Sequence, residues 1–447
     1  MRALNTLIAA TAALAISAGA AFAQTIAITN GRILTGTGEI ERGVVIIRDG
    51  RIAAVGSDVQ VPAGAEVIDA RGGVIAPGFV AVDSGLGGVE VSALGDTNDL
   101  RQASNSLSAA FDVSWGLDPD SFTLPVARLG GITRAIVVPQ HPGSSGGHVH
   151  EEDTAGLGPS GLHSPGLFAG QAAAIHLAEG VDILVEPRVA MVAPFGDAGA
   201  EVAGGARGAE FTLFREILRE VRLYAANRAA YDRGDLRELM LSRADLEALI
   251  PVVQGRMPLI VTVHRASDIR NVLRLAGEEN LDIILDGAEE GWRVADEIAA
   301  AGVPVLLNPL ANLPSSFEVR GATMENAARL HAAGVVIAIK GNEGSVHRAR
   351  EARYNAGNAV AHGLPYAAAI QALTVNPARI FGLEDRIGGI RVGLEADVVV
   401  WTGDPLEPLS QPTAIFIAGR AQPLESRGLE LRDRYRTQRA MPPGYSN

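Results

Sequence analysis

The sequence predicts an α/β fold: a (β/α)8 TIM-type barrel with a small β-sandwich domain built from both chain ends. Three observations support this prediction. The chain has 447 residues, 47% of them hydrophobic, which is enough for one large domain and an accessory domain. Its middle part alternates between strand and helix patterns, whereas both of its ends contain short strands separated by turns.

The first 23 residues are typical of a signal peptide. Arg2 precedes an apolar, uncharged stretch over residues 7–21, and the alanines at 21 and 23 frame a cleavage position. We therefore expect a periplasmic or secreted protein without a stable membrane anchor. An uncleaved anchor is the alternative, but the apolar stretch is short for a membrane-spanning helix. The sequence contains no cysteine, so neither disulfides nor thiolate chemistry can contribute.

Both chain ends are expected to form the β-sandwich, from residues 24–74 and 389–447. Asn30-Gly31 and Asp49-Gly50 are hairpin turn signals, because such pairs tolerate positive φ. The two all-β fragments are each too small for a core of their own, so they most simply pair into one domain. The strands are expected at 27–34, 44–47, 52–55, 67–68, 397–401 and 414–417.

Residues 75–388 are expected to form the barrel. Four strand–helix units follow one another, and such units require parallel strands joined by crossovers. A doubly wound open sheet is the alternative, but no glycine-rich phosphate-binding loop follows any strand. The four strands are expected at 259–263, 283–285, 303–307 and 335–339, with further strands at 131–138 and 189–192 and a long helix at 214–231.

The charge of the chain limits its partners. The formal net charge is −13 at pH 7 and no basic patch stands out, which argues against nucleic acid as a partner. We expect a small-molecule substrate. The Gly-rich region 143–166 and the segment 196–208 are the expected specificity loops, because pocket walls in such a barrel come from the long connections after its strands.

The order of motifs along nearly the whole mature chain resembles the amidohydrolase superfamily. The similarity is to its imidazolonepropionase-like and prolidase-like exported members, and it implies a barrel with a split β-sandwich. The motifs are Asn30-Gly31, Asp49-Gly50-Arg51-Ile52, Pro77-Gly78-Phe79-Val80, Gly130-Gly131-Ile132-Thr133, Thr374-x-Asn376-Pro377-Ala378, Ile387-Gly388 and Ala396-Asp397.

The resemblance implies a divalent metal at the C-terminal mouth of the barrel, where it would activate water and polarise a carbonyl. The family ligands are a His-x-His after strand 1, histidines on strands 5 and 6, and an aspartate on strand 8. In this sequence Asp83 stands in the first slot, His264 matches on strand 5, and Asp286 and Asn342 replace the last two. The ligand set is therefore degenerate. We expect at most one metal, Zn, Mn or Fe, held by Asp83, His264 and Asp286, or none.

Lys340 is the only lysine, against 37 arginines, and precedes the strand-8 position. Its ammonium could replace the missing cation, and the alternative is an exposed lysine placed there by chance. We count His264, Asp286, Asn342 and Lys340 as candidate catalytic residues. Two other features could contribute. His148 and His150 form a His-x-His in a Gly/Ser-rich loop, and Arg265 and Asp268 could pair at the mouth.

Two hypotheses for function follow. The first is an exported hydrolase of non-peptide carbon–nitrogen bonds in amides, lactams or N-acyl amino acids. The second is a catalytically inactive barrel that serves as a binding protein or as the partner subunit of an active relative. A sugar- or oligopeptide-binding protein is a third possibility, against which the motif order argues. Family members commonly self-associate, so a homo-oligomer or hetero-oligomer is expected.

Overall fold

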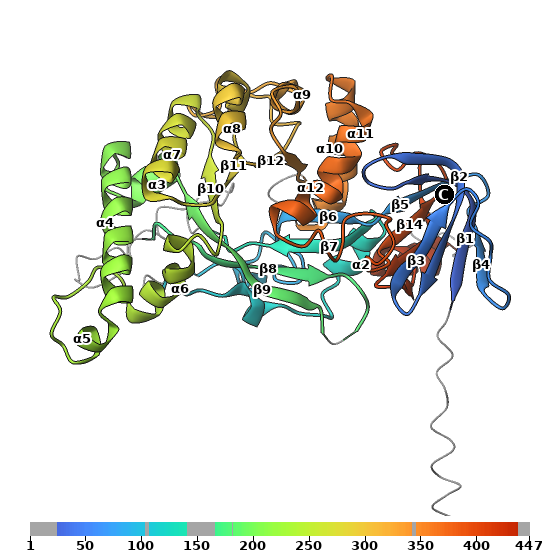
Figure 1. Cartoon of the computed structure of the whole chain (residues 1–447), viewed down its shortest axis with the longest axis horizontal. Coiled ribbons are helices and arrows are strands. Elements are labelled where there is room, and N and C mark those ends of the chain that lie inside the picture. Colours follow the sequence, from blue (N-terminus) through green and yellow to red (C-terminus); the bar gives the residue numbers. More distant parts are fainter. Residues whose placement is uncertain (1–24, 103–106, 141–165, 181, 342–345, 437–447) are drawn as a thin grey trace, which may run out of the picture.

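The computed structural model describes residues 25–102, 107–140, 166–180, 182–341 and 346–436. Two eight-stranded sheets organise this part of the chain (Figure 1). One sheet follows the path β13-β12-β11-β10-β9-β8-β7-β6 and forms a nearly closed barrel. Its strands are β6 (Phe79–Ser84), β7 (Ile132–Val137), β8 (Gly170–His176), β9 (Leu184–Pro194), β10 (Leu259–Val263), β11 (Ile283–Gly287), β12 (Val305–Leu307) and β13 (Ile337–Ile339).

Strands β9 to β13 are parallel neighbours, as the repeated strand–helix units predict. Helices α7 to α11 follow one another along the outside of the later strands (Figure 1). The helices outside the end module are α2 (Thr123–Arg128), α3 (Asp197–Val202), α4 (Arg207–Ala226), α5 (Arg228–Asp232), α6 (Arg243–Val253), α7 (Ala266–Glu279), α8 (Ala295–Ala301), α9 (Asn326–Ala332), α10 (Ala352–Ala361), α11 (Tyr366–Leu373) and α12 (Val375–Ile380). Short 3-10 helices cover Gly95–Thr97, Val113–Gly116, Gly291–Val294 and Val346–Glu351.

Strand β8 differs from an all-parallel barrel. It runs antiparallel to both β7 and β9. The physical reason lies in its connection to β9, which is too short to hold the crossover that a parallel pair needs. The predicted helix over 214–231 also differs, because α4 begins at Arg207 and is separated from α5 at Asn227.

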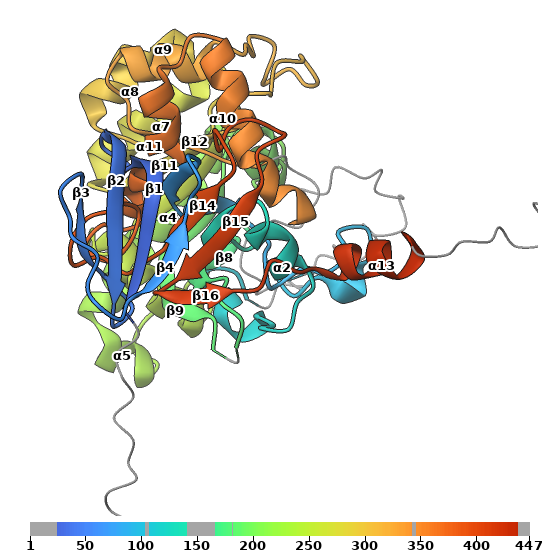
Figure 2. The same ribbon diagram turned by 90° about the vertical axis from the view of Figure 1, so that its right-hand side faces the viewer.

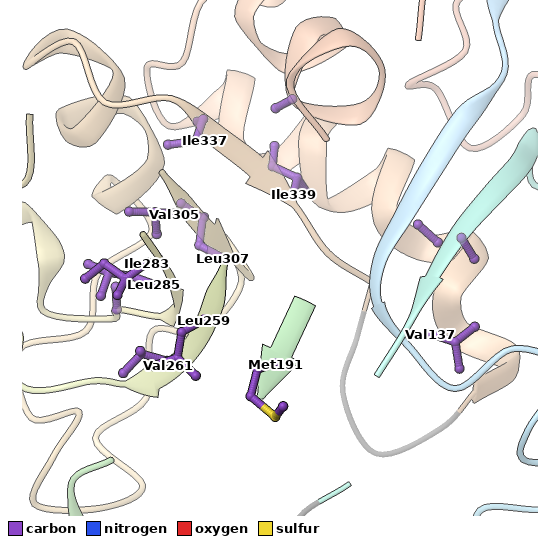
Figure 3. Close-up of a cluster of buried hydrophobic side chains, with 14 of the residues drawn as sticks. Val137, Met191, Leu259, Val261, Ile283, Leu285, Val305, Leu307, Ile337 and Ile339 are labelled. Atoms are coloured by element: carbon purple, nitrogen blue, oxygen red, sulfur yellow. The ribbon is translucent and has the colours of Figure 1, made fainter. Parts of the chain in front are cut away.

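Alternate residues along the barrel strands face two different cores. One set packs outward against the helices, including Leu259 and Val261 of β10 (Figure 3). The other set fills the barrel interior, where Ile260 and Ile284 join Leu306 and Ala338. Because side chains alternate along a strand, the residues in phase with the interior set reach the C-terminal mouth of the barrel.

The two ends of the chain form the second sheet. Its path is β16-β15-β14-β5-β1-β2-β3, with β4 paired to β1, so it is one continuous sheet around its own core. Figure 2 shows the blue N-terminal strands beside the red C-terminal ones. The strands are β1 (Ile26–Leu34), β2 (Glu39–Arg48), β3 (Arg51–Gly56), β4 (Glu66–Asp69), β5 (Val74–Pro77), β14 (Val398–Trp401), β15 (Pro412–Ile417) and β16 (Arg420–Gln422), and helix α13 (Arg427–Arg436) follows them.

Arg134 of β7 joins the barrel to this sheet. Its guanidinium, 3% exposed, donates to Asp397 at 2.6 Å and to Glu395 at 2.6 Å. Gly131, just before β7, has φ +85°, and a Cβ there would lie 2.4 Å from Trp401 Cζ2. Both features join the start of β7 to the end strands.

No helix in the described part of the chain is long and apolar enough to cross a membrane. The predicted signal peptide lies outside the described residues.

Candidate active site

Three charged side chains meet where β6, β11 and β13 end. Asp286 lies in β11 and is in phase with the interior residue Ile284, and Lys340 follows β13 in phase with Ala338. Asp83 lies in β6 with φ +49°, a left-handed backbone conformation that β-strand residues rarely adopt. The strand alternation therefore aims two of these groups into the mouth, and a local backbone turn accompanies the third.

The Lys340 ammonium bridges the two carboxylates. Its Nζ lies 2.8 Å from Asp83 Oδ2 and 2.8 Å from Asp286 Oδ1. Lysine and aspartate are almost never fully buried unless paired, and here the residues Lys340 and Asp286 are only 3% and 5% exposed. We call these three residues the lysine bridge. The alternative of an exposed lysine placed by chance is thus wrong.

Neighbouring groups fix the lysine bridge from several sides. The Lys340 backbone N–H donates to Leu307 O at 3.0 Å, and Asn355 Nδ2 donates to Lys340 O at 2.9 Å. Thr262 Oγ1 lies 3.4 Å from Asp286 Oδ2. Strands β6 and β13 are the two ends of the barrel path, so the bond from Lys340 to Asp83 spans the seam where the barrel closes.

His264 pairs with a glutamate that sequence reasoning missed. Its Nδ1 lies 2.6 Å from Glu289 Oε2, and the His264 side chain is 27% exposed. Gly287, at φ +87°, leaves the space for this pair, because a Cβ there would lie 2.5 Å from His264 Nδ1. Glu289 was detectable only as a second acidic residue three positions after Asp286 in the same strand-end loop.

Electrostatics keep His264 charged at neutral pH. Burial by itself would lower the pKa of His264, but the hydrogen bond to Glu289 and the charges of Glu289, Glu318 and Asp286 outweigh it and raise that pKa to about 9. Burial likewise acts to raise the pKa of Glu289, yet His264 and Lys340 hold it below its ordinary value. The pair is therefore an imidazolium and a carboxylate.

Arg207, at the start of α4, holds a second group of acids. It contacts Asp197 at 2.5 Å, Asp268 at 2.8 Å and Glu318 at 2.8 Å. Arg265 also pairs with Asp268 at 2.9 Å, as predicted from the sequence. We call these five residues the arginine cluster. The arginine cluster connects the loops that follow β9, β10 and β12. Glu318, like Glu289, is a residue that sequence reasoning missed.

Glu210 is a buried acid beside the arginine cluster. It has no exposed surface, and both of its carboxyl oxygens are buried. Burial first, and then the charge of Asp268, raise the pKa of Glu210 to about 8. A carboxyl that is neutral over much of the physiological pH range thus lies within this group of charges.

The structure does not assemble the expected metal ligands. Asp83 and Asp286 are both turned to the Lys340 ammonium, and Nδ1 of His264 bonds to Glu289. Among the described residues no three His, Cys, Asp or Glu side chains are arranged to hold a metal ion. The donor set therefore does not fit a divalent metal, because the Lys340 ammonium already fills the space between its two carboxylates. Asn342, His148 and His150 lie outside the described residues.

Comparisons with known proteins agree with this architecture. Residues 257–422 match the model of the amidohydrolase family, which generally uses a divalent metal. Amidohydrolase tasK of Hapsidospora irregularis is 24% identical over 408 residues, and the match covers 86% of this chain but only 39% of that relative. The chain therefore spans well under half the length of this curated relative.

Solved structures share the fold over most of the chain. An amidohydrolase from Thermotoga maritima is 25% identical with a TM-score of 0.75, and the match covers 89% of this chain and 99% of that one. A Xaa-Pro dipeptidase is 14% identical with a TM-score of 0.51, covering 89% and 99% of the two chains, which shows a shared fold. Together with the motif order and the barrel geometry, these matches show that the chain is similar in sequence and fold to amidohydrolase-superfamily proteins.

Proposed function

We propose that the chain is a periplasmic hydrolase of non-peptide carbon–nitrogen bonds in amides, lactams or N-acyl amino acids. One observation carries the proposal. A fixed ammonium, two carboxylates and a charged histidine–glutamate pair meet at the barrel mouth, where enzymes of this fold carry their active sites. The similarity to amidohydrolases supports a hydrolase and does not favour the alternative of an inactive binding protein.

In the proposed reaction, water attacks the carbonyl carbon and loses a proton to Asp83. Asp83 is suited to this role because its side chain, 26% exposed, is the more accessible carboxylate of the lysine bridge. The Asp286 side chain is only 7% exposed, and its role is to hold the Lys340 ammonium in position. The charge of Lys340 stabilises the oxyanion that forms, since a cation already held in position needs little reorganisation during the reaction.

The tetrahedral intermediate then collapses and its carbon–nitrogen bond breaks. The leaving nitrogen takes a proton from the His264 imidazolium, which Glu289 holds in place. The products are a carboxylic acid and an amine, or one amino acid if the substrate is a lactam. Solvent returns the proton from Asp83 to His264 and restores the starting charges.

The test uses the purified mature chain, residues 24–447, and a panel of simple amides, lactams and N-acyl amino acids, with products measured by mass spectrometry. We expect turnover of at least one class. His264→Gln and Lys340→Met should each reduce kcat/KM by about 100-fold or more, as expected for loss of a proton donor or a charge stabiliser.

The matched control is Arg270→Met on the exposed outer side of α7, where Arg270 pairs with Glu297. This variant should keep wild-type kcat/KM. Absence of turnover over the whole panel, or turnover that His264→Gln leaves unchanged, would contradict the proposed function.

A further inference from the structure

We propose that Lys340 takes the place of a divalent cation, so that the barrel mouth works without a metal and its two carboxylates form a metal site only when Lys340 is removed. The inference rests on the proposed site, but its test needs no substrate. Four observations support it.

The first observation is geometric. Lys340 Nζ lies at the same distance, 2.8 Å, from Asp83 Oδ2 and Asp286 Oδ1. A divalent metal shared by these oxygens would lie about 2 Å from each, in the space the ammonium fills. One site cannot hold both cations, because their charges repel and the space between the carboxylates is already filled.

The second observation concerns charge balance under burial. Two carboxylates this close repel each other unless a cation separates them, and burial of Asp286 makes an uncompensated charge more costly. The ammonium supplies the compensation through two hydrogen-bonded ion pairs. Lys340 therefore satisfies the same electrostatic requirement that a metal would satisfy.

The third observation is the residue type. The chain has 38 lysine and arginine residues, of which 37 are arginines, and this position holds the one lysine. An ammonium is a compact point charge that can lie between two oxygens, whereas the planar guanidinium is larger and binds through a fork. The lysine ammonium therefore fits between the two carboxylates better than an arginine guanidinium would.

The fourth observation is anchoring. The backbone of Lys340 is held by Leu307 O and by the Asn355 side chain at 3.0 and 2.9 Å. His264 Nδ1 bonds to Glu289 at 2.6 Å, and among the described residues no three acidic or histidine side chains are arranged to hold one metal ion. The bridge is built from several elements rather than formed by one flexible side chain.

Metal binding is measured on the mature chain by calorimetric titration with Zn²⁺ and Mn²⁺, and by metal analysis after purification and reloading. Wild type should hold clearly less than one metal per chain and show no one-to-one binding. Lys340→Ala should bind one divalent ion per chain and gain thermal stability when the ion is added. Lys340→Ala/Asp83→Asn should lose this response, because one carboxylate is gone.

Lys340→Met serves if the alanine variant does not fold, since it restores the volume and still removes the charge. Arg329→Met is the matched control, because it removes a cation from an exposed pair with Glu325 and should create no metal site. One equivalent of metal in wild type, released by Asp83→Asn, would overturn the inference. So would a folded Lys340→Ala and a folded Lys340→Met that both fail to bind either ion.

The outcomes also separate this inference from the proposed function. If the wild-type enzyme hydrolyses amides but holds one metal ion, the proposed function stands and the inference about Lys340 is wrong. If the wild type is metal-free and hydrolyses nothing, while its lysine variants bind metal, the inference stands and the proposed function is wrong.

Discussion

Single residues determine which chemistry the barrel mouth can perform. Lys340 places its ammonium group between Asp83 and Asp286, and Glu289 keeps His264 protonated. A protonated histidine is a proton donor and is not a metal ligand. Asp83, Asp286 and His264, the positions where the resemblance implies metal ligands, thus take part in three ion pairs.

The state of His264 makes the activity depend on pH. Its pKa is about 9 in the folded chain, so the imidazolium that donates the proton is lost as pH rises through that value. We expect kcat to fall on the alkaline side near pH 9. Glu289→Gln removes the charge that raises the pKa, so burial dominates and the fall should shift to lower pH.

The measurement is a pH profile of kcat for both proteins. Glu297→Gln changes an exposed carboxylate on α8 and should leave the profile unchanged. An alkaline limb that Glu289→Gln does not move would show that Glu289 has only a structural role.

At the scale of elements, helix α4 carries a buried acid that should make stability fall as pH rises. The pKa of Glu210 is raised from 4.5 to about 8, so between these values the folded state binds a proton that the unfolded state has lost. The unfolding free energy should therefore decrease from about pH 5 to pH 8, by a few kcal/mol at most.

Glu210→Gln keeps the shape and stays neutral, so it should remove this decrease. Urea unfolding at pH 5 and pH 9 measures the effect, with Glu216→Gln on the exposed face of α4 as the control. Equal pH dependence in wild type and Glu210→Gln would contradict the assignment of a neutral Glu210.

Strand β7 depends on Arg134 for its attachment to the end strands. Arg134→Met leaves Asp397 and Glu395 without their buried partner, and loss of one member of a buried pair costs about 3–5 kcal/mol. Arg386 pairs with the same Glu395 but is 43% exposed, so Arg386→Met should cost less than about 1 kcal/mol. Urea unfolding measures the loss of unfolding free energy in the two variants. Equal losses would argue against Arg134 as the residue that attaches β7 to the end strands.

Sequence patterns predicted the elements that rest on local periodicity. The apolar runs between helical segments predicted strands β10 to β13. The structure adds the reason for glycine at position 131, because a Cβ there would meet Trp401. The direction of β8 could not be predicted, because it depends on tertiary pairing with both neighbours. The partners Glu289 and Glu318 were missed for the same reason, since no local pattern marks an acid that meets its partner across loops.

The whole molecule brings its site together through long-range closure. Strand β5 near the start pairs with β14 near the end, so one sheet spans both ends of the chain and supports the barrel between them. Closure then brings β6 beside β13, and the contact between Asp83 and Lys340 crosses 257 positions of sequence. This contact is a fixed ion pair at the centre of the proposed site.

Because the chain has a single lysine, NMR can measure this ion pair directly. In protein labelled with 15N at lysine Nζ, we expect one ammonium signal whose protons exchange slowly with water and whose shift changes in Asp83→Asn and in Asp286→Asn. A signal like that of free lysine, with rapid proton exchange and no response to either substitution, would contradict a fixed ion pair.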